Sequence, residues 1–192
     1  MVFRCNYFCF ILLVLCTISG FSQSAAITID GIFDDWNSSL TTYTDTTESL
    51  SGIDILELQV TNDEDFLFIK IKANIEFDLT DDLVTQQIRL FLDTDNNATT
   101  GFDIQDGYGS EVGIMFKDLF AHYNFNPYSQ VHFASMRLRI APTVTSNEFE
   151  IAIGRAQVPD GINPLFPSQT LKILVKNDAN ADKIPNTGST FS

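Results

Sequence analysis

Hydrophobic and polar residues alternate with a period of two along most of the chain beyond residue 50. In the segment FLFIKIK, one face carries Leu67, Ile69 and Ile71, and the opposite face carries two phenylalanines and two lysines. This alternation is typical of a β-strand that covers a core on one side. The same period recurs in six further segments, at Leu56, Leu58 and Val60; Ile88, Leu90 and Leu92; Val112, Ile114 and Phe116; Ala134, Met136, Leu138 and Ile140; Phe149, Ile151 and Ile153; and Leu171, Ile173 and Val175.

Turn-forming clusters separate these segments, and no stretch of helical length shows a sustained 3.6-residue period. The pattern therefore predicts an all-β protein, an antiparallel β-sandwich with jelly-roll or immunoglobulin-like layers. We expect at most a few short helical turns, around residues 79–84 and 155–158.

An oxygen-rich loop, DTDNNATTGFDIQDGYGSE, follows the apolar segment IRLFL and runs from Asp93 to Glu111. Asp93, Asp95 and Asn97 stand at alternate positions, and Gly101 permits a tight bend that turns their oxygens toward one point. Calcium accepts such oxygen ligands in loose geometry, whereas no cysteine or paired histidine is at hand for zinc. The loop lacks the glycine and glutamate of an EF-hand. The sequence predicts a calcium site, and the alternative is a polar hairpin loop rich in turn formers.

Other acidic residues are further candidates for cation binding. Glu111 returns to the loop as a ligand if the strand from Val112 pairs with the strand that ends at Leu92, and Asp103 and Asp106 are alternative donors. A second run repeats the alternate spacing near the end of the chain, at Asp178, Asn180 and Asp182. This run either holds a second cation or forms a solvated tail.

The first residues resemble an export signal, with Arg4 before a short apolar run and small residues after it. Cleavage is expected after Ser22 or as late as Ala26. The signal predicts a protein that is secreted, extracellular or on the cell surface. The apolar run is too short to span a bilayer. All three cysteines, Cys5, Cys9 and Cys16, lie within this segment, so the mature domain has no disulfide. A bound metal is expected to stabilise the domain in place of a disulfide.

Residues 23–192 are expected to form one domain with a sizeable core. The last residues, STFS, begin a new strand-like pattern. Either a final strand or a further domain follows Ser192, or the protein ends there. Its formal net charge of −14 becomes −15 without Arg4. Such a charge repels phosphates and anionic lipids, which argues against nucleic-acid and membrane partners.

The opening segment ITIDGIFDDWNSS, together with LFIKIKA, IRLFLDTDNNATTG and GYGSEVGIMF, resembles the family 9 carbohydrate-binding modules and their DOMON-like relatives. The likeness covers roughly residues 27–185. It implies a β-sandwich appended to an exported protein, a structural calcium ion, and a glycan end held between aromatic side chains. The resemblance also implies that a glutamate recurs in these modules at the position of Glu111.

The single tryptophan is expected to be structural. Asp30 and Gly31 suit a tight turn, and Trp36 can bury its ring under the edge of the sandwich as an anchor. The pairs of exposed tryptophans that sugar-binding members use are absent, because the chain has one tryptophan. Substitute platforms for a sugar ring stand in or beside loops, where packing is the alternative role: Phe102, Tyr108, Tyr123 and Tyr128.

The chain lacks the common catalytic motifs. No HExxH motif accompanies His122 or His132, and neither a G-x-S-x-G elbow nor a glycine-rich phosphate loop occurs. We therefore expect no enzyme activity. The predicted function is a secreted, calcium-stabilised module that binds a polysaccharide or glycan end. The alternatives are a structural or interaction domain at the cell surface, and an N-terminal accessory domain of a larger extracellular hydrolase.

Overall fold

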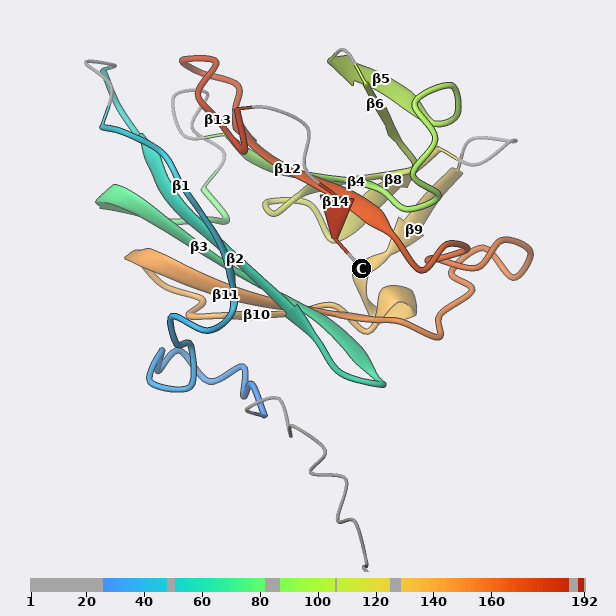
Figure 1. The fold of residues 1–192 in the computed structure, drawn as a ribbon, viewed down its shortest axis with the longest axis horizontal. Coiled ribbons are helices and arrows are strands. Elements are labelled where there is room, and N and C mark those ends of the chain that lie inside the picture. Colours follow the sequence, from blue (N-terminus) through green and yellow to red (C-terminus); the bar gives the residue numbers. More distant parts are fainter. Residues whose placement is uncertain are drawn as a thin grey trace, which may run out of the picture.

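The computed structural model describes residues 26–47, 51–81, 87–105, 107–124, 129–186 and 190–191. The expected signal segment with its cysteines, and the candidates Asp106 and Tyr128, lie outside these residues. The described chain folds into two antiparallel sheets that pack face to face, with a small separate hairpin at one end (Figure 1). None of its helices is long and apolar enough to cross a membrane. The predicted all-β sandwich is confirmed.

The five-stranded sheet has the strand order β1 (Thr41–Thr44), β2 (Ile55–Asn62), β3 (Phe66–Phe77), β11 (Ser146–Gly154) and β10 (Arg139–Ala141). The seven-stranded sheet has the order β13 (Lys183–Ile184), β12 (Leu171–Asn177), β4 (Ile88–Asp93), β7 (Val112–Met115), β8 (Phe120–Tyr123) and β9 (Ser129–His132), and β14 (Thr190–Phe191) also pairs with β12. The hairpin consists of β5 (Phe102–Gln105) and β6 (Tyr108–Ser110). A short 3-10 helix, η2, covers Phe133–Met136.

The core lies between the two large sheets. Alternate residues of each central strand point inward, as the period of two predicts, and on β3 these are Leu67, Ile69 and Ile71. The facing strands contribute their own alternate apolar residues, such as Leu90 on β4 and Ile173 on β12, both fully buried. Burial of these side chains removes apolar surface from water, which is the main stabilising term of the sandwich.

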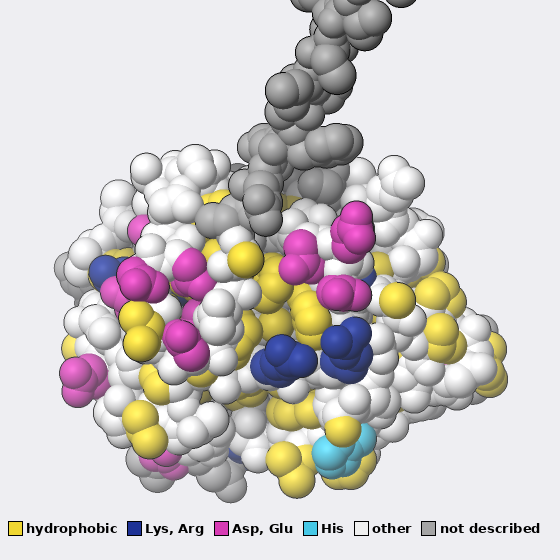
Figure 2. Space-filling model, turned by 90° about the horizontal axis from the view of Figure 1, so that it is seen from below, with side chains coloured by type: hydrophobic (Ala, Val, Ile, Leu, Met, Phe, Trp, Pro, Cys, Tyr) yellow, Lys and Arg dark blue, Asp and Glu magenta, His cyan; other side chains and the backbone are white. Residues whose placement is uncertain are grey.

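The outer face of the five-stranded sheet is also covered, which differs from the expectation of a core on one side of β3. Phe66 and Phe68 pack with Ala152 of β11 in a second, smaller cluster, where Ile27 and Trp36 of the N-terminal segment lie over them. Figure 2 shows hydrophobic side chains in the middle of this side of the molecule, with basic and acidic side chains around them. The chain before β1 thus covers the apolar part of this outer face.

Three local predictions differ from the structure. A β-bulge between Ile55 and Glu57 changes the phase of β2, so that Ile55 is buried and Leu56 is only half-buried. The strand expected from Ala134 begins only at Arg139, because η2 occupies the residues before it and ends on Arg137 in the left-handed conformation, with φ of 51°. Residues 155–156 form a turn and residues 157–158 are not helical; residues 79–81 are not helical either, and residues 82–84 of that prediction lie outside the described residues.

Candidate functional site

Strand pairing brings two distant acidic residues of the loop together. Asp93 is the last residue of β4, and Glu111 stands between β6 and β7. Since β4 and β7 pair antiparallel with Leu92 opposite Val112, the end of one strand lies beside the start of the other. This is the pairing on which the predicted role of Glu111 depends.

The carboxylate groups of Asp93, Asp95 and Glu111 form a compact cluster, called the carboxylate cluster below. One oxygen from each lies within 4.8 Å of the others. Asp93 and Glu111 are buried, and Asp93 Oδ2 and Glu111 Oε1 have no hydrogen-bond partner in the described part of the chain. Buried carboxylate oxygens without partners are costly, and a bound cation would compensate them.

Backbone donors hold the other carboxylate oxygens in place. The amide of Thr94 donates to Glu111 Oε2 over 2.8 Å, and the amide of Asn97 donates to Asp93 Oδ1 over 3.0 Å and to Asp95 Oδ1 over 2.9 Å. The hydroxyl of Thr100 donates to Asp95 Oδ2 over 2.9 Å. The loop is therefore folded around the three carboxylates, and these hydrogen bonds orient their oxygens.

Gly101 makes room for this arrangement. Its φ of 68° lies in the left-handed region, and a Cβ atom at this position would lie 2.5 Å from the Ser110 carbonyl oxygen and 2.6 Å from Glu111 Oε1. Any side chain would clash with the backbone and with Glu111 itself. The loop therefore needs glycine both for its conformation and for the close approach of Glu111.

Burial raises the pKa of Glu111 to about 7, and the charges of Asp95 and Asp93 add to this effect, while the hydrogen bond from Thr94 opposes it. Without a cation, the folded protein therefore binds a proton at Glu111 more tightly than the unfolded chain does. Since a proton stabilises the cation-free fold, this contribution is present below pH 4.5 and is lost as the pH rises to about 7.

We predict that the free energy of unfolding of the chelated protein falls by on the order of 2 kcal/mol between pH 4.5 and 7 through this group. Chemical denaturation in chelator across this range measures the change. Glu111→Gln, which cannot titrate, provides the control, and its stability is expected to be flatter with pH. The same slope in both proteins would contradict the assignment to Glu111.

The structure gives the remaining loop candidates different surroundings. Asn97 uses its side-chain oxygen to accept hydrogen bonds from the amide and hydroxyl of Thr99, at 3.1 and 2.8 Å, so its role as a ligand stays a prediction. Asp103 is exposed on β5 and is not part of the carboxylate cluster. Lys172, which no sequence motif marked, places its Nζ 3.5 Å from Asp93 Oδ2, because β12 pairs Lys172 with Asp93 across the sheet.

The second acidic run is not assembled like the first. Asp178 pairs with Arg89 and with Lys176, at 2.5 and 3.2 Å. Asn180 donates to the Ile53 carbonyl, and Asp182 accepts from the Ile55 amide over 2.6 Å. Within the described residues this run therefore makes separate contacts that fasten the end of β12 to the start of β2, and a second cation there stays a prediction.

A buried glutamate explains the position of the N-terminal segment. Glu150 of β11 is fully buried and accepts hydrogen bonds from the Asp30 and Gly31 amides, at 2.7 and 2.5 Å, and from Trp36 Nε1, at 3.0 Å. Trp36 is itself buried. The motif Asp30, Gly31 and Trp36 therefore lies around one carboxylate, 114 residues away from Trp36 in sequence. The one sequence signal for this contact is the position of Glu150, an acidic residue among apolar neighbours in the segment FEIAI.

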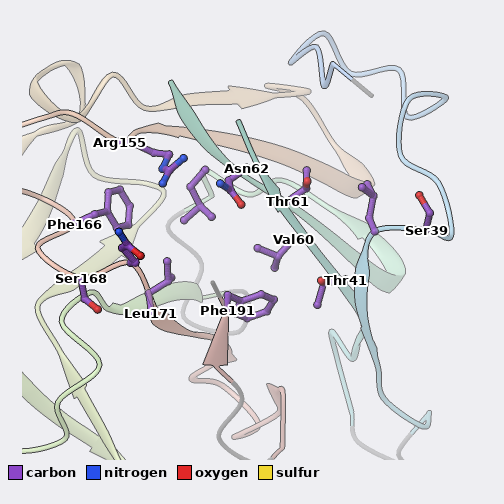
Figure 3. A pocket seen from close by; sticks show the side chains of 13 residues that line it. Ser39, Thr41, Val60, Thr61, Asn62, Arg155, Phe166, Ser168, Leu171 and Phe191 are labelled. Carbon is purple, nitrogen blue, oxygen red and sulfur yellow. The ribbon is translucent and has the colours of Figure 1, made fainter. Parts of the chain in front are cut away.

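A pocket of about 290 Å³ lies between the edges of the two large sheets (Figure 3). Polar side chains from three parts of the chain line it together with apolar ones: Ser39, Leu40, Thr41, Val60, Thr61, Asn62, Leu67, Arg155, Phe166, Ser168, Gln169, Leu171 and Phe191. Arg155, Phe166 and Ser168 come from the long connection between β11 and β12. No motif in the sequence marked these residues as a group.

The predicted aromatic platforms do not form a common surface. Tyr108 and Tyr123 are buried, at 1% and 0% exposure, so their rings have no free face on which a sugar can stack. The Tyr123 hydroxyl instead donates to the Asn163 carbonyl over 2.8 Å. Phe102 is 60% exposed on the small hairpin. Of the candidates within the described residues, Phe102 alone remains available to a ligand.

No family model matches the chain, and no curated protein matches it. Among solved structures, the chain is similar to a family 9 carbohydrate-binding module from Caldicellulosiruptor kristjanssonii in complex with glucose, with 10% identity and a TM-score of 0.43 over 82% of this chain and 79% of the other. It is also similar to a family 9 module from the same organism in complex with cellotriose, with 12% identity and a TM-score of 0.42 over 86% of this chain and 77% of the other.

Proposed function

We propose that this chain is a non-catalytic saccharide-binding module of the β-sandwich class, exported from the cell and stabilised by calcium. The pocket between the sheet edges carries this proposal. It combines the half-buried ring of Phe166 with amide and hydroxyl groups on Asn62, Gln169, Ser168 and Thr41. An aromatic face with a few surrounding polar groups suits a sugar, whose ring has apolar faces and hydroxyl edges.

The chemistry of the lining favours binding over hydrolysis. The described residues that line the pocket include no aspartate or glutamate. A typical glycosidase needs two facing carboxyl groups to donate a proton and to activate water or form a covalent bond. The pocket supplies hydrogen bonds and apolar contact only, which supports a binding role.

Calcium is the cation that best suits the carboxylate cluster. Three carboxylates provide hard oxygen ligands, and two of their oxygens are buried without a hydrogen-bond partner in the described chain. One of these, Asp93 Oδ2, has the Lys172 ammonium group 3.5 Å away, and the other is Glu111 Oε1. Calcium tolerates an irregular ligand shell and takes backbone carbonyls and water for the remaining positions. Asp93, Asp95 and Glu111 would hold the ion, with Asn97 as a predicted further ligand, and the ion would neutralise the repulsion among the three carboxylates.

We predict that Phe166→Ala weakens saccharide binding by at least about tenfold, since loss of an aromatic stacking surface costs on the order of 1.5 kcal/mol. Isothermal titration calorimetry of the calcium-loaded protein against a panel of neutral and acidic mono- and oligosaccharides measures this change. Asn62→Ala is expected to weaken binding less, by removal of hydrogen bonds from one amide.

Phe102→Ala is the matched control, because it removes an exposed phenylalanine on the small hairpin outside the pocket. Its affinity should equal that of the unmodified protein. If binding depended on Phe102 and not on Phe166, the saccharide site would lie at the hairpin. If the folded, calcium-loaded protein bound no saccharide in the panel, the structural or interaction role would be favoured instead.

A further inference from the structure

Arg155 is the one charged side chain among the described residues that line the pocket, on a protein with a formal net charge of −14. It lies just after β11, where its amide donates to the Asp65 carbonyl over 2.9 Å and its Nη1 donates to the Asp63 carbonyl. These contacts fix the backbone and one side of the guanidinium group. Figure 3 shows the rest of the side chain at the pocket, on the same side as Phe166.

The other basic side chains of the chain mostly have different partners. Lys70, Lys72, Arg89, Lys172 and Lys176 form ion pairs with carboxylates. Arg137 and Arg139 stack over the Phe66 ring, with their guanidinium carbons 4.5 and 4.9 Å from its centroid. Arg155 has neither kind of partner within the described residues. Its amide donates to the Asp65 carbonyl and its Nη1 donates to the Asp63 carbonyl.

An arginine held only by neutral groups has no counter-ion beside its positive charge and keeps further donors for a ligand. Its guanidinium group carries five N–H donors in a planar fork, and the geometry of this fork matches a carboxylate. Asp63 of the nearest acidic loop accepts hydrogen bonds at Oδ1 from the Asp65 and Phe66 amides, at 2.8 and 2.7 Å, and none of the ion pairs within the described residues joins this loop to Arg155. A carboxylate that enters the pocket would find an available partner there.

We propose that the pocket selects an acidic sugar, a hexuronic acid, whose carboxylate pairs with Arg155 while its ring lies against Phe166. This inference rests on the proposed saccharide-binding function and adds the class of sugar. The pocket volume of about 290 Å³ is at the small end of the range for small-molecule sites, which suits one or two sugar rings. Asn62, Ser168 and Gln169 supply donors and acceptors for the hydroxyl groups of the ring.

Matched pairs of sugars that differ only at the sixth carbon test this selection. Calorimetry with glucuronate against glucose, and with galacturonate against galactose, uses the calcium-loaded protein in a buffer of low ionic strength. The acidic member of at least one pair is expected to bind at least about tenfold more tightly, which is the usual strength of a charge-assisted hydrogen bond. This preference should shrink as salt is added, because exposed charges are screened.

Arg155→Gln is expected to abolish the preference, and Arg155→Lys to keep part of it, since lysine retains the charge without the fork. Arg139→Gln is the matched control: it removes the same charge from the outer face of the five-stranded sheet, and it should leave the preference intact. A thermal melt of each variant verifies that it is folded.

The outcomes separate this inference from the function on which it rests. Equal binding of acidic and neutral sugars, or a preference that survives Arg155→Gln, would overturn the selection of a uronic acid and leave saccharide binding in place. Acetate that binds as tightly as glucuronate would show recognition of a carboxylate without a sugar, which also overturns it. Binding of none of these sugars or their oligomers would overturn both.

Discussion

Glu150→Ala is expected to destabilise the fold by about 3 to 5 kcal/mol, because it leaves one buried and two partly buried donors without their acceptor. The Asp30 and Gly31 amides and Trp36 Nε1 all donate to this one carboxylate. Trp36→Ala should cost a similar amount, about 3 to 5 kcal/mol, through the cavity left by the indole ring. Urea denaturation monitored by far-ultraviolet circular dichroism measures both changes.

A double-mutant cycle distinguishes this shared anchor from two separate defects. If Trp36 and Glu150 stabilise the same N-terminal segment, the double variant should lose less stability than the two single changes together, by about 0.5 to 3 kcal/mol. Limited proteolysis within residues 26–40 should increase in either variant. Glu64→Ala, which removes an exposed acidic residue, is the control and should change neither measurement. Additive losses with no new cleavage would contradict the anchor.

Removal of calcium is expected to lower the melting temperature by roughly 5 to 10 °C. An ion that binds only the folded state stabilises it by about 2.7 kcal/mol at a concentration one hundred times its Kd. For a domain of this size, each kcal/mol corresponds to roughly 2 to 4 °C. Differential scanning calorimetry with calcium and with chelator, on protein whose metal content is first measured, provides the test.

Two variants separate specific binding from relief of the net negative charge. Asp95→Ala removes one member of the carboxylate cluster and should abolish most of the calcium-dependent shift. Asp34→Ala removes an exposed carboxylate from the N-terminal segment and should leave the shift nearly unchanged. Equal shifts in the two variants, or no shift on chelation of metal-loaded protein, would show that the cluster does not hold calcium.

The sequence alone predicted the features that depend on neighbouring residues. The alternation in FLFIKIK assigned Leu67, Ile69 and Ile71 to the core, because successive side chains of a strand point to opposite faces whatever the strand packs against. The spacing of Asp93 and Asp95 placed two carboxylates in one loop for a similar reason. Their local geometry follows from a few consecutive backbone angles.

Local pattern was misleading where a contact from elsewhere decides the conformation. The run from Ala134 to Ile140 alternates like a strand, yet its first residues form η2, and only Arg139–Ala141 pair with β11. The bulge in β2 likewise shifts burial from Leu56 to Ile55. Periodicity does not record such changes, because they arise from pairing with another strand.

Only the tertiary structure decided which distant residues meet. Glu111 joins Asp93 because β7 pairs with β4, and Lys172 faces Asp93 because β12 pairs with the other side of β4. Glu150 meets Trp36 across 114 residues of sequence, and the pocket takes Asn62 and Arg155 from different strand ends. The order and register of strands set these contacts, and they depend on packing of the whole sandwich rather than on the residues beside each position.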